Sequence, residues 1–448
     1  MSNNIVLKKG LDIPLAGVPD LAVSRTIIPD TVAVQPSDFK GLNPRLLVRE
    51  GDRVLAGSPV LADKKNPDIL VTSPVSGTVK EVVRGDKRKL LAVLVAPDEV
   101  QESLDFGVPG DGITAGDVKD ILLKSGLWAA FIQRPYGIVA DPAATPKAIF
   151  VSAFSTAPLA ADTEFTLASE ATSVQAGVSA LAKLAKVHVC VKSADSAFAK
   201  LRDAEVHVVK GKHPAGNVGV QISHISPILK DETVWTVNLA LLAAIGRLFR
   251  TGRYDVRRTV AVGGPAVNGP GYVKAYPGTP MTAFKQFYVD AEGVRIISGD
   301  VLTGRNVGEG GYLGFYDTQV TMLKEGTEPE LLGWARPFRF NQYSADHTYF
   351  NWCLGLMGKE RAMDTNLHGG PRAFVMPDSY YAKYLPMDIY PLYLTKACLA
   401  GDIDNMEKYG IYEVLPEDFA LVEFIDPSKN YIQDIIADGI DLMLKEMA

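Results

Sequence analysis

The sequence predicts a multidomain protein of α/β and β structure, and three observations lead to this fold class. With 448 residues, the chain is too long for a single hydrophobic core. Residues 1–100 contain only short strand-like runs, whereas residues 101–252 alternate strand-like runs with helical ones. The texture then changes twice more, which predicts a small β-rich module over 253–330 and a helical domain over 331–448.

The first module contains the stretch VREGDRVLAGSPVLADKKNPDILVTSPVSGTVKEVV, which runs from Val48 to Val83. Its short β-branched runs are separated by Gly-Asp, Ala-Gly and Ser-Gly turns, as in lipoyl and biotinyl carrier domains. A carrier domain presents one modified lysine at the tip of a tight hairpin. Here Lys64 and Lys65 share a longer turn that Pro67 stiffens. We therefore predict a structural scaffold and no swinging prosthetic group.

The remaining modules are distinguished by their periodicity. Helical spacing in AGDVKDILLKSGLW and EATSVQAGVSALAKLAK alternates with the buried-strand runs KAIFVSAF, VHVCVKS and VHVVKG, which predicts a layered α/β domain. The segment RRTVAVGGPAVNGPG is dense in glycine and proline and predicts short strands. In YIQDIIADGIDLMLKEM, the four isoleucines fall on one face of a helix: Ile432, Ile435, Ile436 and Ile440.

Composition and charge indicate which kinds of binding partner and cell compartment this protein is expected to have. The net charge is −6 and the pI is near 5.6, so nucleic-acid binding is disfavoured because it usually needs a basic surface. The most apolar run, Val234–Gly246, has 13 residues and is too short to span a bilayer, so we expect any membrane association to come through partners. The N-terminus shows no secretory signal, and the 3 cysteines have neither disulfide nor zinc spacing, which favours a reducing compartment.

Several phrases together resemble one family. They are KKGLDIPLAGVPD, GDRVLAGSPVLADKKNPDILVTSPVSGTVKEVVRG, KSGLW, HPAGNVG and PMDIYPLYLTKACLAGDID. Over essentially the whole chain, the sequence is similar to the A subunit of the sodium-translocating NADH:quinone oxidoreductase. More distantly, it resembles the flavin-binding subunit of complex I and the C subunit of the Rnf complex. The resemblance implies a lipoyl-like barrel-sandwich hybrid, a Rossmann-like domain, a β-grasp soluble-ligand-binding module and a ferredoxin-like C-terminal remnant.

Against those relatives, two cofactor motifs have changed. Their glycine-rich flavin loop corresponds here to SGLWAAFIQRP, in which Trp128 is sterically hostile to a pyrophosphate. The four cluster-ligating cysteines of the Rnf relative correspond to other residue types, at Pro416, Phe419, Val422 and Asp426. We expect no tightly bound cofactor in this chain. The resemblance implies that the NADH, flavin and iron–sulfur centres belong to partner subunits.

Two segments are candidate quinone-binding sites. KHPAGNVGVQISHISP places His213 and His224 around Gly216, so a flat ring could approach the backbone while an imidazole bonds a quinone carbonyl. The second segment offers Phe131 and Arg134, an aromatic and a cation that suit a headgroup. Ordinary packing of both segments is the competing interpretation. We predict no metal site, because the histidine spacing matches no common ligand motif.

The resemblance implies a peripheral subunit on the cytoplasmic side of the bacterial inner membrane. The complex would oxidise NADH, reduce ubiquinone or menaquinone and export sodium. This subunit would act in quinone reduction and assembly, bound to the other subunits (B to F), above all the quinone-proximal membrane subunit, and would not be catalytic alone. Two alternatives stay open: a flavin-dependent NADH dehydrogenase subunit like that of complex I, and a ligand-binding β-grasp protein.

Overall fold

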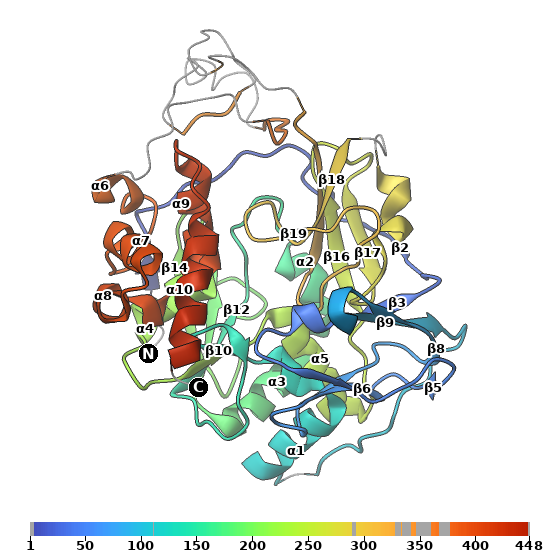
Figure 1. Cartoon of the computed structure of the whole chain (residues 1–448). Coiled ribbons are helices and arrows are strands. Elements are labelled where there is room, and N and C mark those ends of the chain that lie inside the picture. Colours follow the sequence, from blue (N-terminus) through green and yellow to red (C-terminus); the bar gives the residue numbers. More distant parts are fainter. Residues whose placement is uncertain are drawn as a thin grey trace.

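The protein folds around four β-sheets, which correspond to the predicted mixture of α/β and β modules. The structure is a computed structural model and describes residues 4–110, 112–288, 293–327, 333, 342–345, 360–366 and 377–446. In Figure 1 the C-terminal helices lie on one side and a six-stranded sheet on the other, with the α/β domain between and below them. The predicted fold class is confirmed.

The first β module consists of a four-stranded sheet, in the order β3-β9-β8-β5, and a three-stranded sheet, in the order β4-β6-β7. Its strands are β3 (Val32–Val34), β4 (Pro44–Leu46), β5 (Arg53–Val54), β6 (Pro59–Asp63), β7 (Leu70–Thr72), β8 (Gly77–Arg84) and β9 (Leu90–Pro97). All the pairings within these sheets are antiparallel. Lys64 and Lys65 are exposed in the turn between β6 and β7.

The α/β domain contains a seven-stranded sheet in the order β1-β14-β13-β12-β15-β10-β11. Its strands are β1 (Asn4–Val6), β10 (Ile132–Arg134), β11 (Ile138–Val139), β12 (Ala148–Ser152), β13 (Val187–Val191), β14 (Glu205–Lys210) and β15 (Val234–Thr236). Neighbouring strands in the series β1, β14, β13, β12 and β15 pair in parallel. The last two strands of the sheet, β10 and β11, pair antiparallel. These parallel strands are nearly all apolar, as expected of a sheet that is covered on both faces.

Helices cover both faces of this sheet. They are α1 (Ala115–Ser125), α2 (Thr163–Leu167), α3 (Ala171–Leu184), α4 (Val218–Ile225) and α5 (Leu239–Thr251). Because strand residues alternate between faces, Ile149 and Val151 pack with the α3–α5 core, while Ala148 and Phe150 pack against Ile222 of α4. Asn238 begins α5 by accepting a hydrogen bond from the Leu241 N–H at 2.8 Å.

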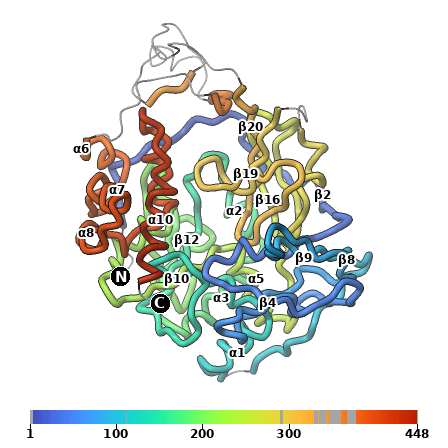
Figure 2. Tube along the Cα trace, in the orientation of Figure 1, coloured from blue at the N-terminus to red at the C-terminus, as the bar shows by residue number. Residues whose placement is uncertain are grey.

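The third module is a six-stranded sheet in the order β19-β18-β20-β16-β17-β2. Its strands are β2 (Val23–Thr26), β16 (Arg258–Gly263), β17 (Gly271–Ala275), β18 (Val294–Ser298), β19 (Arg305–Asn306) and β20 (Gln319–Lys324). The chain before residue 32 therefore serves two other modules, because β1 pairs with β14 and β2 with β17. Figure 2 follows this blue N-terminal segment across the molecule. The predicted grouping of residues 1–100 does not describe these two strands.

The C-terminal helices are α6 (Asp378–Tyr381), α7 (Pro391–Ala400), α8 (Ile403–Tyr409), α9 (Ala420–Ile425) and α10 (Ile432–Glu446), with the short 3-10 helix η9 (Pro416–Phe419) before α9. Ile432, Ile436 and Ile440 are buried, which agrees with the predicted apolar face of the last helix. Phe419 and Val422, at two of the positions predicted to correspond to cluster cysteines, are fully buried in this core. Asp426, at a third, accepts hydrogen bonds from the backbone N–H groups of Ser428 and Asn430.

Candidate functional site

A cavity of about 530 Å³ lies between the α/β domain, the six-stranded sheet and the C-terminal region, and Asp38 and Lys40 of the first β module also line it. The chain places β13 on one side of β12 and later places β15 on the other, so the connections diverge between these two strands. Such a divergence opens a crevice at the carboxyl ends of the strands, which is the usual binding position in open α/β sheets. Ser152 at the end of β12 and Thr236 at the end of β15 line this cavity. Its volume falls within the range of small-molecule sites.

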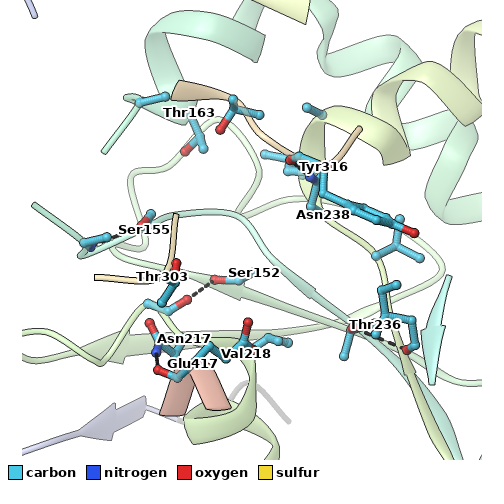
Figure 3. A pocket seen from close by; sticks show the side chains of 18 of the residues that line it. Ser152, Ser155, Thr163, Asn217, Val218, Thr236, Asn238, Thr303, Tyr316 and Glu417 are labelled. Carbon is cyan, nitrogen blue, oxygen red and sulfur yellow. Dashed lines mark hydrogen bonds between the residues drawn. The ribbon is translucent and has the colours of Figure 1, made fainter. Parts of the chain in front are cut away.

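Figure 3 shows side chains around the space that come from the α/β domain, from the module of the six-stranded sheet and from η9. Asn217 and Glu417 lie on one side, and Asn238 and Tyr316 on the other. The Asn238 amide donates a hydrogen bond to the Tyr316 carbonyl at 2.9 Å, and the Tyr316 hydroxyl donates to the Ala129 carbonyl at 2.6 Å. These bonds attach the loop before β20 to the α/β domain and fix this wall of the cavity.

His213 follows β14 and lines the cavity, as the sequence predicted for a candidate site residue. Its side chain is 2% exposed, and burial lowers its pKa, so the ring is neutral near pH 7. The Nδ1 atom lies 3.2 Å from the Thr156 hydroxyl, which itself accepts a hydrogen bond from the Gly216 N–H at 2.9 Å. In the tautomer whose Nδ1 accepts a hydrogen bond from this hydroxyl, the ring carries its proton on Nε2. Nε2 is buried and has no partner among the described residues.

Gly216 is required for the close approach of two loops beside His213. A Cβ atom at this position would lie 2.5 Å from the Thr156 backbone nitrogen. The Gly216 carbonyl also accepts a hydrogen bond from the Ser152 hydroxyl at 3.0 Å. A flat ring was predicted to approach the backbone at this glycine. In the structure, the protein's own 155–156 loop lies there instead.

Arg258, the first residue of β16, also lines the cavity. It is 6% exposed, and both terminal guanidinium nitrogens lack a hydrogen-bond partner among the described residues. Burial lowers its pKa to about 10, although the nearby carboxylate of Asp317 opposes that shift. Asp38 on the same cavity wall is engaged elsewhere, because it accepts hydrogen bonds from Arg305 and from the Phe315 N–H. Arg258 is therefore a buried cation over the Phe315 ring, 6.0 Å from its centroid, whose two terminal nitrogens have no hydrogen-bond partner in the described part of the chain.

Arg134 lines the cavity from β10, and its two terminal nitrogens are paired, whereas its buried Nε has no hydrogen-bond partner among the described residues. Its guanidinium is 1% exposed and contacts Asp418 at 2.9 Å as well as Glu417. Burial alone would lower the pKa of Arg134, but the attraction of these two carboxylates raises it. Because Glu417 and Asp418 belong to η9, this cluster joins the α/β domain to the C-terminal helices.

The structure does not bring the other two predicted residues to the cavity. Phe131 is fully buried and stacks on Trp128 with ring centroids 5.1 Å apart. Trp128 is also fully buried, and its indole N–H donates to the Ala140 carbonyl at 2.8 Å, so this segment contributes to the domain core. His224 is exposed on α4 and its Nδ1 donates to the Val220 carbonyl at 2.9 Å.

Arg258, Asn238 and Tyr316 were missed by the sequence analysis. One signal was present for Arg258, because a charged residue directly precedes the apolar run TVAVG of a buried strand. Asn238 was visible as a polar residue at the start of an apolar helix, which predicts an N-cap but not a site. Nothing in the sequence distinguishes Tyr316 from the other tyrosines.

Comparison with known proteins supplies an independent line of evidence. Three regions match described family domains: the NqrA N-terminal barrel-sandwich hybrid domain over residues 5–98, the NqrA second alpha/beta domain over 113–254, and the NQRA C-terminal domain over 259–309. No helix among the described residues has the length and apolar character needed to cross a membrane.

Whole-chain relatives are also similar. The A subunit of the Na(+)-translocating NADH-quinone reductase of Serratia proteamaculans is 37% identical, over 99% of this chain and 100% of the relative. The corresponding protein of Pseudomonas aeruginosa is 35% identical, over 97% of this chain and 98% of the relative. Among solved structures, an NAD+-reducing [NiFe]-hydrogenase in the air-oxidized state gives a TM-score of 0.37 at 12% identity, covering 72% of this chain and 63% of that chain. This last likeness is too low to support an argument.

Proposed function

Because the chain belongs to the NqrA family, the A subunits of Na(+)-translocating NADH-quinone reductases, we propose that it provides a quinone-headgroup site in such a complex. Its relatives are subunits of a translocase, so this chain is a complex subunit that works with other subunits. The site we propose is the cavity between the α/β domain, the six-stranded sheet and η9. The quinone would be bound there during its reduction.

The main observation in support is a pair of buried donors on the wall of one cavity. The His213 Nε2 and the two terminal nitrogens of Arg258 have no hydrogen-bond partner among the described residues, and both residues line the space. An unpaired buried donor costs roughly 1–3 kcal/mol, and a ligand that accepts its hydrogen bond removes this penalty. Such donors are expected where the protein is shaped for an absent acceptor.

A quinone headgroup fits this chemistry. It is a flat, neutral ring with carbonyl oxygens at opposite ends, and these oxygens only accept hydrogen bonds. His213 would donate to one carbonyl and Arg258 to the other. Arg258 would also stabilise the negative charge that develops on a carbonyl oxygen during reduction, because a buried cation acts strongly on charge in a low-dielectric site.

The rest of the proposal concerns the complex. Electrons would reach the quinone from flavin and iron–sulfur centres held by partner subunits. The chain would bind the membrane subunits on the cytoplasmic side and contribute to sodium export only through the assembled complex. The predicted quinone-binding roles of Phe131 and His224 have no geometric support at this cavity, so we do not include them.

The test is quinone binding to the full chain. His213→Ala should lower the affinity for a short-chain ubiquinone by up to about tenfold, the value of one hydrogen bond to a neutral carbonyl. Arg258→Met should lower it by roughly ten- to a hundredfold, because hydrogen bonds from a charged donor are stronger. Binding would be measured by calorimetric titration, with thermal unfolding recorded on the same samples.

His224→Ala is the matched control. His224 belongs to the same segment as His213, but its side chain is exposed and does not line the cavity. It should bind quinone like the wild type. If folded His213→Ala and Arg258→Met proteins both keep the wild-type affinity, the cavity is not the quinone site. Should either variant fail to fold, the other decides the matter.

A further inference from the structure

A second group of polar side chains lies at the opposite end of the seven-stranded sheet. β13 and β14 are parallel neighbours, and His188 is the register partner of Glu205 while Cys190 is that of His207. Register partners point to the same face, and so do residues two apart on one strand. His188, Glu205 and His207 therefore share one face near the amino ends of these strands. We call these three residues the amino-end cluster.

The three side chains converge closely. The His188 Nδ1 lies 2.9 Å from the His207 Nε2 and 3.6 Å from a Glu205 oxygen. One nitrogen or carboxylate oxygen from each residue falls within 4.8 Å of the others. From this geometry we propose that the amino-end cluster binds a divalent transition-metal ion of the zinc, cobalt or nickel type.

The ligand types suit such an ion. Two neutral imidazoles and one carboxylate are a frequent ligand set for borderline divalent metals, which leaves further positions for water. Burial lowers the pKa of His188 to about 4 and also lowers that of His207, so both rings are neutral and able to ligate near pH 7. The hydrogen bond to Lys186 lowers the pKa of Glu205, which keeps this carboxylate ionised.

The rings are held in place before any ion arrives. His188 and His207 are 4% and 1% exposed. His188 stacks on Phe150 of the neighbouring strand, with ring centroids 4.7 Å apart and planes 18° apart. Glu205 is more open, at 41% exposure, and one of its oxygens is bound by Lys186 at 3.0 Å. The other oxygen faces His188 and offers the route by which an ion would enter.

The nitrogen separation limits the coordination geometry. With metal–nitrogen bonds of about 2.0–2.1 Å, two nitrogens 2.9 Å apart subtend an angle of about 90° at the metal. That angle suits a six-coordinate site completed by water. A tetrahedral zinc site needs the nitrogens to move apart by roughly 0.4 Å. Metal binding requires both of these nitrogens to be unprotonated, so the proton that one ring now donates to the other would move to the second nitrogen of its own ring, which stays neutral.

The experiment is a titration of the metal-free full chain with Zn²⁺, and separately with Ni²⁺, followed by calorimetry and by metal analysis after dialysis. The wild type should bind one ion per chain at micromolar concentrations, and the ion should raise Tm. Glu205→Gln keeps the shape of the side chain and should weaken binding at least tenfold, because even outer partners of a ligand are worth about 10–100-fold. His188→Gln should abolish the site.

His224→Ala serves as the control for adventitious binding at a surface histidine, and it should keep the wild-type stoichiometry and affinity. The proposal fails if the wild type binds no stoichiometric ion, or if Glu205→Gln and His188→Gln bind like the wild type. If the buried His188→Gln protein does not fold, Glu205→Gln alone decides the outcome, since this residue is partly exposed and its loss leaves both rings in place.

Discussion

The two ends of the seven-stranded sheet present polar side chains in contrasting ways. At the carboxyl ends, the cavity is assembled from the α/β domain, the six-stranded sheet and η9, and the two donor residues that we propose for the quinone, His213 and Arg258, are 45 positions apart in different modules. At the amino ends, the amino-end cluster comes from two adjacent strands in direct register. The first site therefore depends on how the modules pack against one another, whereas the second depends on the pairing of two strands.

The largest expected effect is a loss of stability that tests how the C-terminal helices are attached to the α/β domain. Arg134→Met should reduce the free energy of unfolding by about 3–5 kcal/mol, because Asp418, which is fully buried, would lose its counter-charge. Urea unfolding would measure the loss. Lys147→Ala is the matched control, since the Lys147–Glu232 pair at 2.8 Å is at the surface and should be worth at most about 1 kcal/mol. Equal losses in the two variants would show that this buried pair does not hold the C-terminal helices.

A smaller effect tests the amino-end cluster through acid sensitivity. The unfolded chain protonates His188 near pH 6.5, its ordinary value, whereas the folded chain does so near pH 4. Between these values the unfolded state binds more protons, so stability falls as the pH falls from about 6.5 to about 4. His188 should contribute on the order of 3 kcal/mol to this loss.

His188→Gln should therefore show a flatter dependence of unfolding free energy on pH, measured by urea unfolding at several pH values. The residual slope belongs partly to His207 and His213, whose pKa values are also lowered by burial. His224→Gln, at an exposed position, should keep the wild-type slope. A His188→Gln protein with the full wild-type slope would show that the ring is not held neutral by its surroundings.

The smallest effect concerns a region outside both ends of the sheet. Lys64→Ala and Lys65→Ala, singly or together, should leave the melting temperature and the activity of the assembled complex nearly unchanged, because both side chains are exposed in a turn. Surface substitutions of this kind usually change stability by less than about 0.5 kcal/mol. Mass spectrometry that found lipoate or biotin on either lysine would overturn the scaffold interpretation.

The candidate site could be predicted only in part. His213, Gly216 and Arg134 were identified from their segments, and all three line the cavity. Phe131 and His224 were chosen by proximity in sequence, but Phe131 packs inward against Trp128 and His224 lies on the outer face of α4. The sequence shows which residues are close along the chain. The direction in which a side chain points depends on how the surrounding residues pack in the folded protein.

The sequence alone determined the family and the fold class, because motifs, periodicity and turn residues are local features of the chain. It did not determine that β1 and β2 leave the first module to join two other sheets. Nor did it reveal that Arg258 and His213 line one cavity with nitrogens that have no hydrogen-bond partner among the described residues, or that His188 meets His207. Strand register and module docking are decided by burial of apolar surface summed over the whole chain. Only the tertiary structure therefore shows which polar atoms are left without partners.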